Sequence, residues 1–180
     1  GNASYYYSFT RMVASGEVTT PEGTFEVKGS SWLDREWSTS VLESNQVGWD
    51  WFALQLNDGT DLMYYQLRDK AGKTDEQSSG KLVNPNGESR NLNFQEVALK
   101  VVELWQSPNS GASYPAEWTL KLPSESLDLQ ISPRMSDQEL QTAVSYWEGS
   151  VLVKGTQNGQ PIQGVGYVEM TGYDQFMTSV

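Results

Sequence analysis

Apolar and polar residues alternate with a period of two along most of the chain, which is typical of β-strands that have one buried face. The clearest example is Gln46–Leu56 (QVGWDWFALQL), which is followed by Asn57-Asp58-Gly59-Thr60 and then by Asp61–Arg68 (DLMYYQLR). An Asp-Gly pair between two alternating segments is a strong hairpin signal. The sequence therefore predicts two antiparallel strands joined by a tight turn at Asp58-Gly59.

Similar segments occur along the rest of the chain, separated by turns rich in Gly, Pro and Asn. Further strands are predicted at Tyr5–Ser15, Gly23–Lys28, Ser31–Ser38, Glu96–Trp105, Glu117–Leu122, Leu127–Ile131, Thr142–Lys154 and Gln163–Tyr173. Residues 69–80 are expected to form a polar loop, and residues 136–142 contain the one helical pattern, a possible capping box. We expect one all-β domain over residues 1–180: an antiparallel barrel or strongly curved sheet, with at most one short helix near 136–142.

Several predicted strands place aromatic and acidic side chains on the same face. Ser31–Ser38 reads SWLDREWS, and as a strand it has Trp32, Asp34, Glu36 and Ser38 on one face and Leu33, Arg35 and Trp37 on the other. Because Trp is rarely left wholly in water, we expect Trp32 and Asp34 to be buried together inside the barrel.

The same combination recurs further along the chain. Tyr167, Glu169, Thr171 and Tyr173 share one face of their segment, and Trp49 and Trp51 share a face, with Asp50 on the opposite side together with Phe52 and Leu54. Tyr64 and Tyr65 point to opposite faces, so at most one of them can line a pocket. These patterns predict a cavity with a wall of aromatic and carboxylate groups.

Charge and composition limit the possible chemistry. Asp plus Glu number 23 against 12 Lys plus Arg, and the net charge of −11 argues against nucleic acid as a partner. The chain has no Cys and no His, so disulfides, thiolate chemistry and a Ser-His-Asp triad are excluded. Acid-base chemistry must use Asp, Glu, Tyr, Lys or water, and we expect no metal and no cofactor. No apolar run reaches the length of a membrane span, and the first residues lack the pattern of an export signal.

Five blocks of the sequence together resemble one known family. They are Tyr5–Arg11 (YYYSFTR), Ser31–Trp37, Gly48–Leu56, Tyr146–Gly149 (YWEG) and Gly166–Tyr173 (GYVEMTGY). In this order they resemble the carotenoid 1,2-hydratase and AttH-type family of lipocalin-like proteins. Members have been described as hydroxyneurosporene synthases or predicted secreted hydrolases, and fungal pericyclases are similar.

The resemblance implies more than the fold. Proteins of this family have two lipocalin-like halves, and this chain resembles the C-terminal half, so the resemblance implies an N-terminal half as partner. A surface left uncovered by that half could instead form a homodimer. Bacterial relatives imply a periplasmic or secreted location. The family commonly has His where this sequence has Arg35, which stays protonated and cannot transfer a proton.

For the candidate catalytic residues Asp34 and Glu36, two interpretations remain open. They can form a buried acid pair, one member of which protonates an isoprenoid double bond. Alternatively, they pair with Arg35, Arg11 or lysines of neighbouring strands and stabilise the barrel.

Candidate ligand-binding residues share aromatic rings or carboxylates: Trp32, Trp49, Trp51, Tyr65, Trp147, Glu148, Tyr167 and Glu169. Each aromatic side chain among them can bind an apolar chain or a developing carbocation, or can simply belong to the core. Three functions follow: an enzyme of the hydratase or cyclase type, or a hydrolase, that acts on an apolar isoprenoid or lipid; a carrier that binds a lipid unchanged; and a structural half that packs on its partner. The absence of His favours the second and third functions over a hydrolase.

Overall fold

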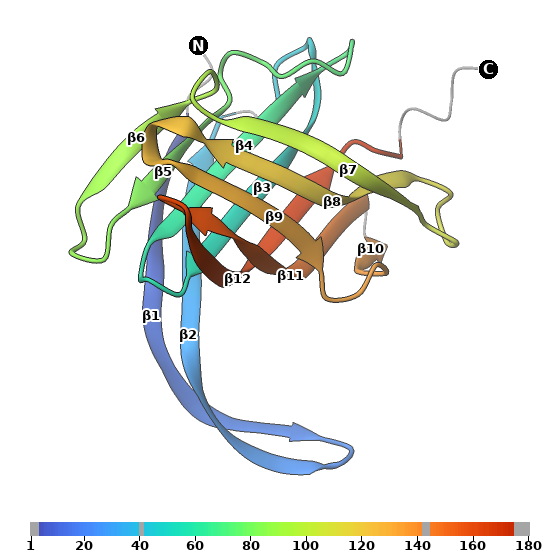
Figure 1. The fold of residues 1–180 in the computed structure, drawn as a ribbon. Coiled ribbons are helices and arrows are strands. Elements are labelled where there is room, and N and C mark those ends of the chain that lie inside the picture. The colour runs from blue at the N-terminus through green and yellow to red at the C-terminus, as the bar shows by residue number, and fades with distance from the viewer. Residues whose placement is uncertain (1–3, 40–41, 142–144, 175–180) are drawn as a thin grey trace. The chain divides into compact units, whose positions relative to one another are not determined.

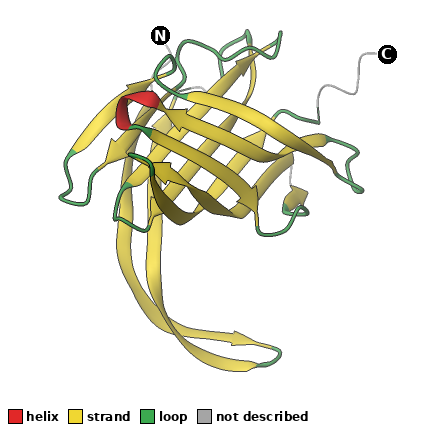
Figure 2. Ribbon diagram, viewed as in Figure 1, coloured by secondary structure: helices red, strands yellow, loops and turns green. Residues whose placement is uncertain are grey.

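The fold consists of β-strands throughout the part of the chain that the structure, a computed structural model, describes: residues 4–39, 42–141 and 145–174. Within these residues there are twelve strands, one 3-10 turn at Pro123–Glu125 and no α-helix, as Figure 2 shows. The chain divides into two compact units, Gly1–Glu43 and Ser44–Val180, which are described separately below. The expectation of a single domain over residues 1–180 stays a prediction.

The first unit is a long antiparallel hairpin of β1 (Ser4–Thr20) and β2 (Gly23–Ser38). The register runs from Ser4 opposite Ser38 to Thr20 opposite Gly23, with one irregularity between Phe9 and Met12. The sequence predicted two strands in the region of β2, at 23–28 and 31–38. They form one strand, because the residues between them continue the pairing with β1.

The second unit is a ten-stranded antiparallel sheet. Its strands are, in spatial order, β6 (Ser89–Asn93), β5 (Ser79–Val83), β4 (Asp61–Asp69), β3 (Gln46–Leu56), β12 (Gln160–Thr171), β11 (Ser145–Gln157), β9 (Leu127–Pro133), β8 (Ser113–Leu122) and β7 (Ala98–Gln106), and β10 (Glu139–Gln141) pairs with β11. Figure 1 shows the sheet curled so that β7, β8 and β9 pass in front of β3 and β4. The predicted all-β, antiparallel, strongly curved sheet is confirmed.

The curl encloses a core to which both ends of the sheet contribute. Phe52 on β3 packs edge-on against Trp118 on β8 at a centroid distance of 5.6 Å, and Trp118 packs against Trp147 on β11 at 6.3 Å. All three side chains are buried. Aromatic side chains bury large apolar areas and gain about 0.5–1.5 kcal/mol more from such edge-on contacts. This core determines which face of each strand is internal.

The hairpin between β3 and β4 forms where the sequence predicts it. Gly59 has a φ of +92°, which favours glycine, and Leu56 donates a backbone hydrogen bond of 2.8 Å to Thr60. The Asp58 carboxylate accepts a hydrogen bond of 2.9 Å from the Thr60 amide. The turn chemistry of Asp-Gly therefore sets the register of this pair.

The helix considered near 136–142 does not form over 136–141; residue 142 lies outside the described residues. Residues 139–141 are instead β10. Contacts with β11 explain the difference: the Trp147 indole donates to the Ser136 carbonyl at 2.8 Å, and Gln138 Oε1 accepts from the Ser150 amide at 2.9 Å. Tertiary hydrogen bonds thus outweigh a weak local helix signal. No helix among the described residues has the length and apolar character needed to cross a membrane.

Candidate functional site

Asp34 lies at the centre of a hydrogen-bond cluster within the first unit. Its Oδ1 accepts hydrogen bonds from Trp32 Nε1 at 2.9 Å, from Ser8 Oγ at 2.7 Å and from the hydroxyl of Tyr6. Ser8 lies directly opposite Asp34 in the strand register, so the pairing of β1 with β2 assembles the cluster. Every hydrogen bond recorded to Asp34 within the described residues ends on Oδ1, and none ends on Oδ2.

Glu36 forms a separate, smaller contact on the same face, where it accepts a hydrogen bond from Ser4 Oγ. Arg35 points to the opposite face and stacks on Trp37, with 5.4 Å between its guanidinium carbon and the ring centroid. Among the described residues the recorded partners of Asp34 and Glu36 are therefore neutral donors, and ion pairing with Arg35 is not seen. The predicted distribution of side chains on the two faces of β2 agrees with these contacts.

Trp32 and Asp34 share a face, as expected, but both are half-buried, and the expectation that they are largely buried was wrong. Within the hairpin itself, which is a sheet of only two strands, there is no second layer of strands to enclose them.

A second group of aromatic and acidic residues lies on the outer face of the sheet in the second unit, opposite the core. We call it the aromatic-acid face: Trp49, Trp51, Tyr65, Tyr146, Glu148, Tyr167 and Glu169. Four of these residues form one row across adjacent strands, in which Glu148 pairs with Glu169, Glu169 with Trp51, and Trp51 with Tyr65. Strand alternation explains the arrangement, because the intervening residues, such as Phe52 and Val168, enter the core.

Hydrogen bonds link the acids of this face to its rings. Trp49 Nε1 donates to Glu169 Oε1 at 2.8 Å, and the Tyr167 hydroxyl donates to Glu148 Oε2 at 3.3 Å. Trp49 also contacts Tyr146 edge-on, with ring centroids 6.3 Å apart. The sequence pattern identified the aromatic and acidic wall, but assigned it to a cavity, whereas the structure places it on the face away from the core.

Negative charge on this face affects the neighbouring phenols. Burial, followed by the charges of Glu169 and Glu148, raises the pKa of Tyr146. Burial, followed by the charge of Glu148, also raises the pKa of Tyr167. Both phenols therefore stay protonated at neutral pH and can donate hydrogen bonds.

Two other aromatic candidates lie in different environments. Trp147 is in the core, where its exposed fraction is 1% and its indole bonds to Ser136. Tyr64 is also in the core, so Tyr65 is the member of the Tyr64-Tyr65 pair on the aromatic-acid face, where its hydroxyl accepts a hydrogen bond of 2.8 Å from Ser79. Trp147 is therefore separated from the other ligand-binding candidates of the second unit.

Sequence reasoning missed two groups of polar residues. Tyr6 and Ser8 complete the Asp34 cluster, and the short alternation Ser4-x-Tyr6-x-Ser8 was the available signal. In the second unit, Arg68 Nε lies 3.4 Å from Asp50 Oδ1 in a buried ion pair. Asp50 shares its face of the strand with Phe52 and Leu54, so its burial was predictable, and a buried carboxylate needs a partner for its charge. The sequence did not show that Arg68 is that partner.

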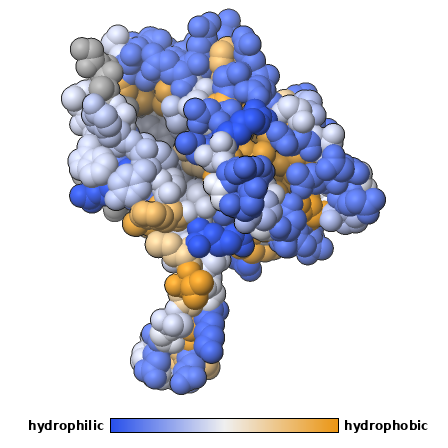
Figure 3. All heavy atoms as spheres, turned by 90° about the vertical axis from the view of Figure 1, so that its left-hand side faces the viewer, coloured by the Kyte–Doolittle hydropathy of each residue, from blue (hydrophilic) through white to orange (hydrophobic). Residues whose placement is uncertain are grey.

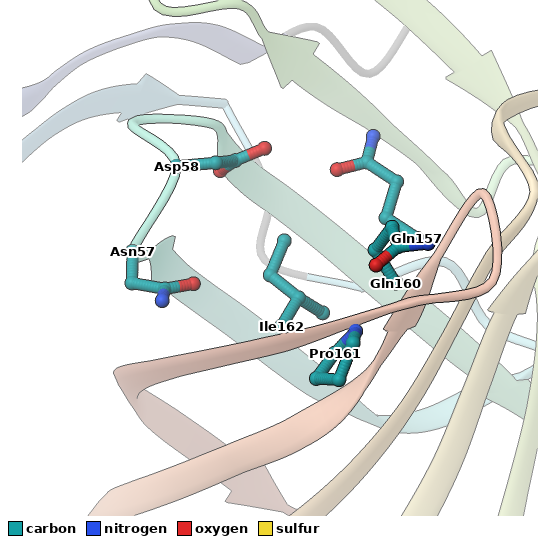
Figure 4. A pocket seen from close by; sticks show the side chains of 6 residues that line it. All are labelled: Asn57, Asp58, Gln157, Gln160, Pro161 and Ile162. Carbon is teal, nitrogen blue, oxygen red and sulfur yellow. The ribbon is translucent and has the colours of Figure 1, made fainter.

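A small polar pocket opens between two turns of the second unit (Figure 4). It has a volume of about 200 Å³ and is lined by Asn57, Asp58, Gln157, Gln160, Pro161 and Ile162. Asn57 and Asp58 bond to neighbouring backbone groups, namely the amides of Gln163 and Thr60. The pocket contains none of the predicted site residues. Within the described residues there is also no group of three or more acidic side chains arranged to hold a metal ion.

The face of the hairpin opposite Asp34 is apolar and exposed. It carries Tyr5, Tyr7, Phe9, Leu33 and Trp37. The Tyr7 ring contacts those of Phe9 and Trp37 at centroid distances of 5.7 Å and 5.8 Å. At the turn end of the same hairpin, seen at the bottom of Figure 3, apolar and polar side chains are interleaved. Phe9 is 56% exposed and Trp37 is 51% exposed, which is typical of a surface that contacts another molecule.

Comparisons with known proteins find one family model and solved structures that match most of the chain. No curated protein matches the chain. The crystal structure of a protein assigned as AttH from Nitrosomonas europaea has a TM-score of 0.82 and 36% identity, and the match covers 94% of this chain and 52% of that one. Kievitone hydratase from Nectria haematococca has a TM-score of 0.77 at 20% identity, over 94% of this chain and 53% of that one, which shows a shared fold.

The chain thus spans about half the length of both structures. The family model described as AttH-like matches residues 1–173, nearly the whole sequence. This match includes the hairpin with the Asp34 cluster and the sheet with the aromatic-acid face. Together with the 36% identity to the Nitrosomonas europaea protein, it shows that the chain belongs to the AttH-like family.

Proposed function

We propose that this domain takes part in hydratase-type chemistry on an apolar, isoprenoid-like ligand, with Asp34 as the acid. The observation that carries the proposal is the Asp34 cluster, in which three donors hold Oδ1 and no recorded hydrogen bond within the described residues uses Oδ2. The fold shared with kievitone hydratase supports a hydratase over a hydrolase.

The proposed reaction needs one proton donor and one water. Protonated Asp34 transfers the proton from Oδ2 to one carbon of the double bond, a water oxygen bonds to the other carbon, and a proton of that water returns to the carboxylate. Trp32, Ser8 and Tyr6 fix the position of the carboxylate, which is the contribution of proximity and orientation. Glu36 lies on the same face of β2 and acts as a second acid or as an acceptor for the water.

An assay with a polyene isoprenoid tests this function. Product that has gained one water, detected by mass spectrometry, is expected from the native protein and should be lost in Asp34→Asn, which preserves the shape of the side chain and its acceptor oxygen. Glu26→Gln is the matched control, because Glu26 is an exposed acid on the same strand. Equal product formation by Asp34→Asn and native protein would exclude Asp34 as the acid.

A second candidate function is ligand binding without chemistry. The Trp49–Glu169 hydrogen bond supports it, because an indole held in place by a carboxylate presents a fixed apolar surface at low entropic cost. Mass spectrometry of lipid extracted from the purified protein tests this candidate. Retained lipid that is recovered unchanged after incubation with water and protein would favour a carrier over a hydratase.

We also propose that a partner covers the apolar face of the hairpin. A two-stranded hairpin is only marginally stable unless another element packs on its apolar face. The relatives are about twice as long as this chain, which supports an AttH-like half as that partner. Sedimentation at several concentrations tests the exposed face: self-association that weakens in Trp37→Ser is expected, and a strictly monomeric native chain would contradict it.

A further inference from the structure

We infer that the apolar face of the hairpin continues along its whole length and that a second copy of this chain, itself an AttH-like half, stacks on it face to face. The inference deepens the proposal of a partner for the hairpin, and rests on it, by naming that partner and the residues it contacts. It does not depend on catalysis by Asp34, which lies on the opposite face of the hairpin.

The first step is an irregularity in the pairing of β1 with β2. Phe9 lies opposite Leu33 and Met12 lies opposite Ser31, so β1 advances by three residues where β2 advances by two. Directly opposed residues of an antiparallel pair point to the same face of the sheet. Phe9 and Met12 therefore share a face, although they are three residues apart, because β1 contains a bulge of one extra residue between them.

The bulge extends the apolar face to the turn of the hairpin. Most small and apolar residues of β1 occupy odd positions before the bulge and even positions after it, whereas most of those in β2 occupy odd positions throughout. The bulge keeps the two strands in phase and gives the hairpin one continuous apolar face. On the turn side of the bulge this face carries Met12, Ala14, Gly16, Val18, Phe25 and Val27.

The second step concerns two glycines near the middle of this face. Gly29 lies opposite Ala14, and Gly16 lies opposite Val27. Neither glycine has a positive φ, and within the described residues a Cβ at either position would meet nothing within 4 Å. Glycine weakens a strand and often marks the close approach of another backbone. Since nothing within the hairpin requires these glycines, they indicate a partner whose backbone approaches there.

The third step is the fit of one copy to another. Large apolar side chains occupy both ends of the face, with Trp37 at the open end and Phe25 beside the turn, and the small residues lie between them. When two such faces stack antiparallel about a two-fold axis, the small middle of one copy meets that of the other. The open end of each copy then lies over the turn end of its partner. The contact is isologous, as in most homodimers.

The fourth step is the area that the stack covers. β1 has 17 residues, so at about 3.3 Å per residue the face is about 55 Å long, and two strands about 4.8 Å apart make it about 10 Å wide. Stacking along the full length covers about 1,000 Å² in total over the two copies, which is the lower limit for a specific interface. The open end alone covers about half of this area, so a stable stack needs the turn end as well.

Sedimentation of the native chain and of single variants at several concentrations tests the length of the contact. Phe25→Ser at the turn end should weaken the dimer about tenfold, as should Trp37→Ser at the open end. Thr24→Ser, at an exposed residue next to Phe25 that points to the opposite face, is the matched control and should have no effect. Weakening by Trp37→Ser alone would overturn the inference, although it would agree with a partner that covers only the open end.

Gly29→Val separates a specific stack from general apolar adhesion. Valine favours strands and its Cβ has room within the chain, so the variant should fold normally. The added side chain should hold the two backbones apart and weaken the dimer about tenfold, even though it adds apolar surface. Ser15→Val, on the neighbouring residue pair and facing the other way, is the matched control and should leave the dimer unchanged.

Equal or stronger self-association of Gly29→Val would show non-specific adhesion and would overturn the inference. Added salt screens the repulsion between two copies that each carry a net charge of −11, so the dimer should become tighter, and a dimer that dissociates in salt would also overturn it. A strictly monomeric native chain would contradict both the inference and the proposed partner. A failed hydration assay would affect neither, because Asp34 is on the other face.

Discussion

The hydroxyl of Tyr173 donates to both carboxylate oxygens of Asp50, at 2.9 Å and 3.1 Å. The same ring lies under the guanidinium of Arg68, with 3.9 Å from its carbon to the ring centroid. Arg68 also donates to the carbonyl of Thr171, the last residue of β12. Because Asp50 is on β3 and Arg68 on β4, this buried cluster fastens the end of β12 and the residues after it to two neighbouring strands.

Arg68→Met should lower the free energy of unfolding by about 3–5 kcal/mol, because it leaves the buried Asp50 without its counter-charge. Tyr173→Phe removes only a hydrogen bond to a charged group and should cost about 1.5–3 kcal/mol. Arg35→Met, at an exposed cation on the hairpin, is the control and should cost less than about 1 kcal/mol. Urea unfolding measures all three; an Arg68→Met variant as stable as the control would contradict the ion pair.

The cluster should also give a specific pH dependence. Burial raises the pKa of Asp50, although Arg68 and the Tyr173 hydrogen bond oppose the shift. The folded state then binds a proton more tightly than the unfolded state, so this carboxyl contributes less stability as the pH rises above about 4, the ordinary pKa of Asp. The unfolding free energy of the native protein minus that of Asp50→Asn should therefore fall with rising pH. A difference that rises with pH would indicate a lowered pKa.

Gly48 lies against this cluster, and its lack of a side chain is required there. A Cβ at this position would lie 2.3 Å from the carbonyl oxygen of Thr171 and 2.7 Å from the Arg68 guanidinium. Gly48→Ala should cost about 1–3 kcal/mol or more, as overpacking does. Gly16→Ala on the hairpin is the matched control, because a Cβ there meets nothing within 4 Å. Equal melting temperatures for Gly48→Ala and Gly16→Ala would argue against the close approach of Gly48 to Thr171 and Arg68.

The sequence predicted individual strands better than it predicted the internal face of the sheet. The alternation of Trp49 with Asp50 correctly separated two faces, and the buried Asp50 lies on the side of Phe52 and Leu54. The sequence did not show that Trp118, far along the chain, packs on Phe52 and makes that side the core. Both faces of β3 carry aromatic side chains, so only the long-range curl decides between them.

Two further features of the structure were not predicted: the short strands β5 and β6, and the residues of β1 that face Asp34. β5 and β6 (SGKLV and SRNLN) contain too few apolar residues to be recognised by alternation, and they form by pairing in register with β4 and with each other. The Asp34 cluster depends on which residue of β1 faces Asp34, and register between two distant segments is not readable from either alone. Trp32 and Asp34, two residues apart on one strand, were predictable from alternation.

Trp147→Phe separates core packing from ligand binding. The change removes the indole hydrogen bond to Ser136 and weakens the edge-on contact with Trp118, so the free energy of unfolding should fall by about 1–3 kcal/mol. The amount of lipid that co-purifies with the protein should not change, because Trp147 lies in the core and the aromatic-acid face lies on the other side of the sheet. Mass spectrometry of the extracted lipid checks this expectation. Weaker binding in a folded Trp147→Phe variant would place the ligand in the interior instead.

Two buried tyrosines should respond oppositely to the loss of their hydroxyl. Tyr64 is fully buried, and its hydroxyl has no hydrogen-bond partner among the described residues. Burial, with a smaller effect of Tyr65, raises the pKa of Tyr64 to about 12, so the phenol stays neutral across the physiological range. Tyr64→Phe removes an unpaired polar group and should leave the free energy of unfolding unchanged or raise it by up to about 1 kcal/mol.

Tyr114 is the matched comparison, because its ring is equally buried and its hydroxyl donates to Glu139 Oε1 at 2.9 Å. Tyr114→Phe should lower the free energy of unfolding by about 1.5–3 kcal/mol, the range for a hydrogen bond to a charged group. The urea midpoints of both variants measure these two changes in stability. They are compared at pH 7, where neither phenol is ionised. If Tyr64→Phe destabilised the fold as much as Tyr114→Phe does, the Tyr64 hydroxyl would have to be paired in solution.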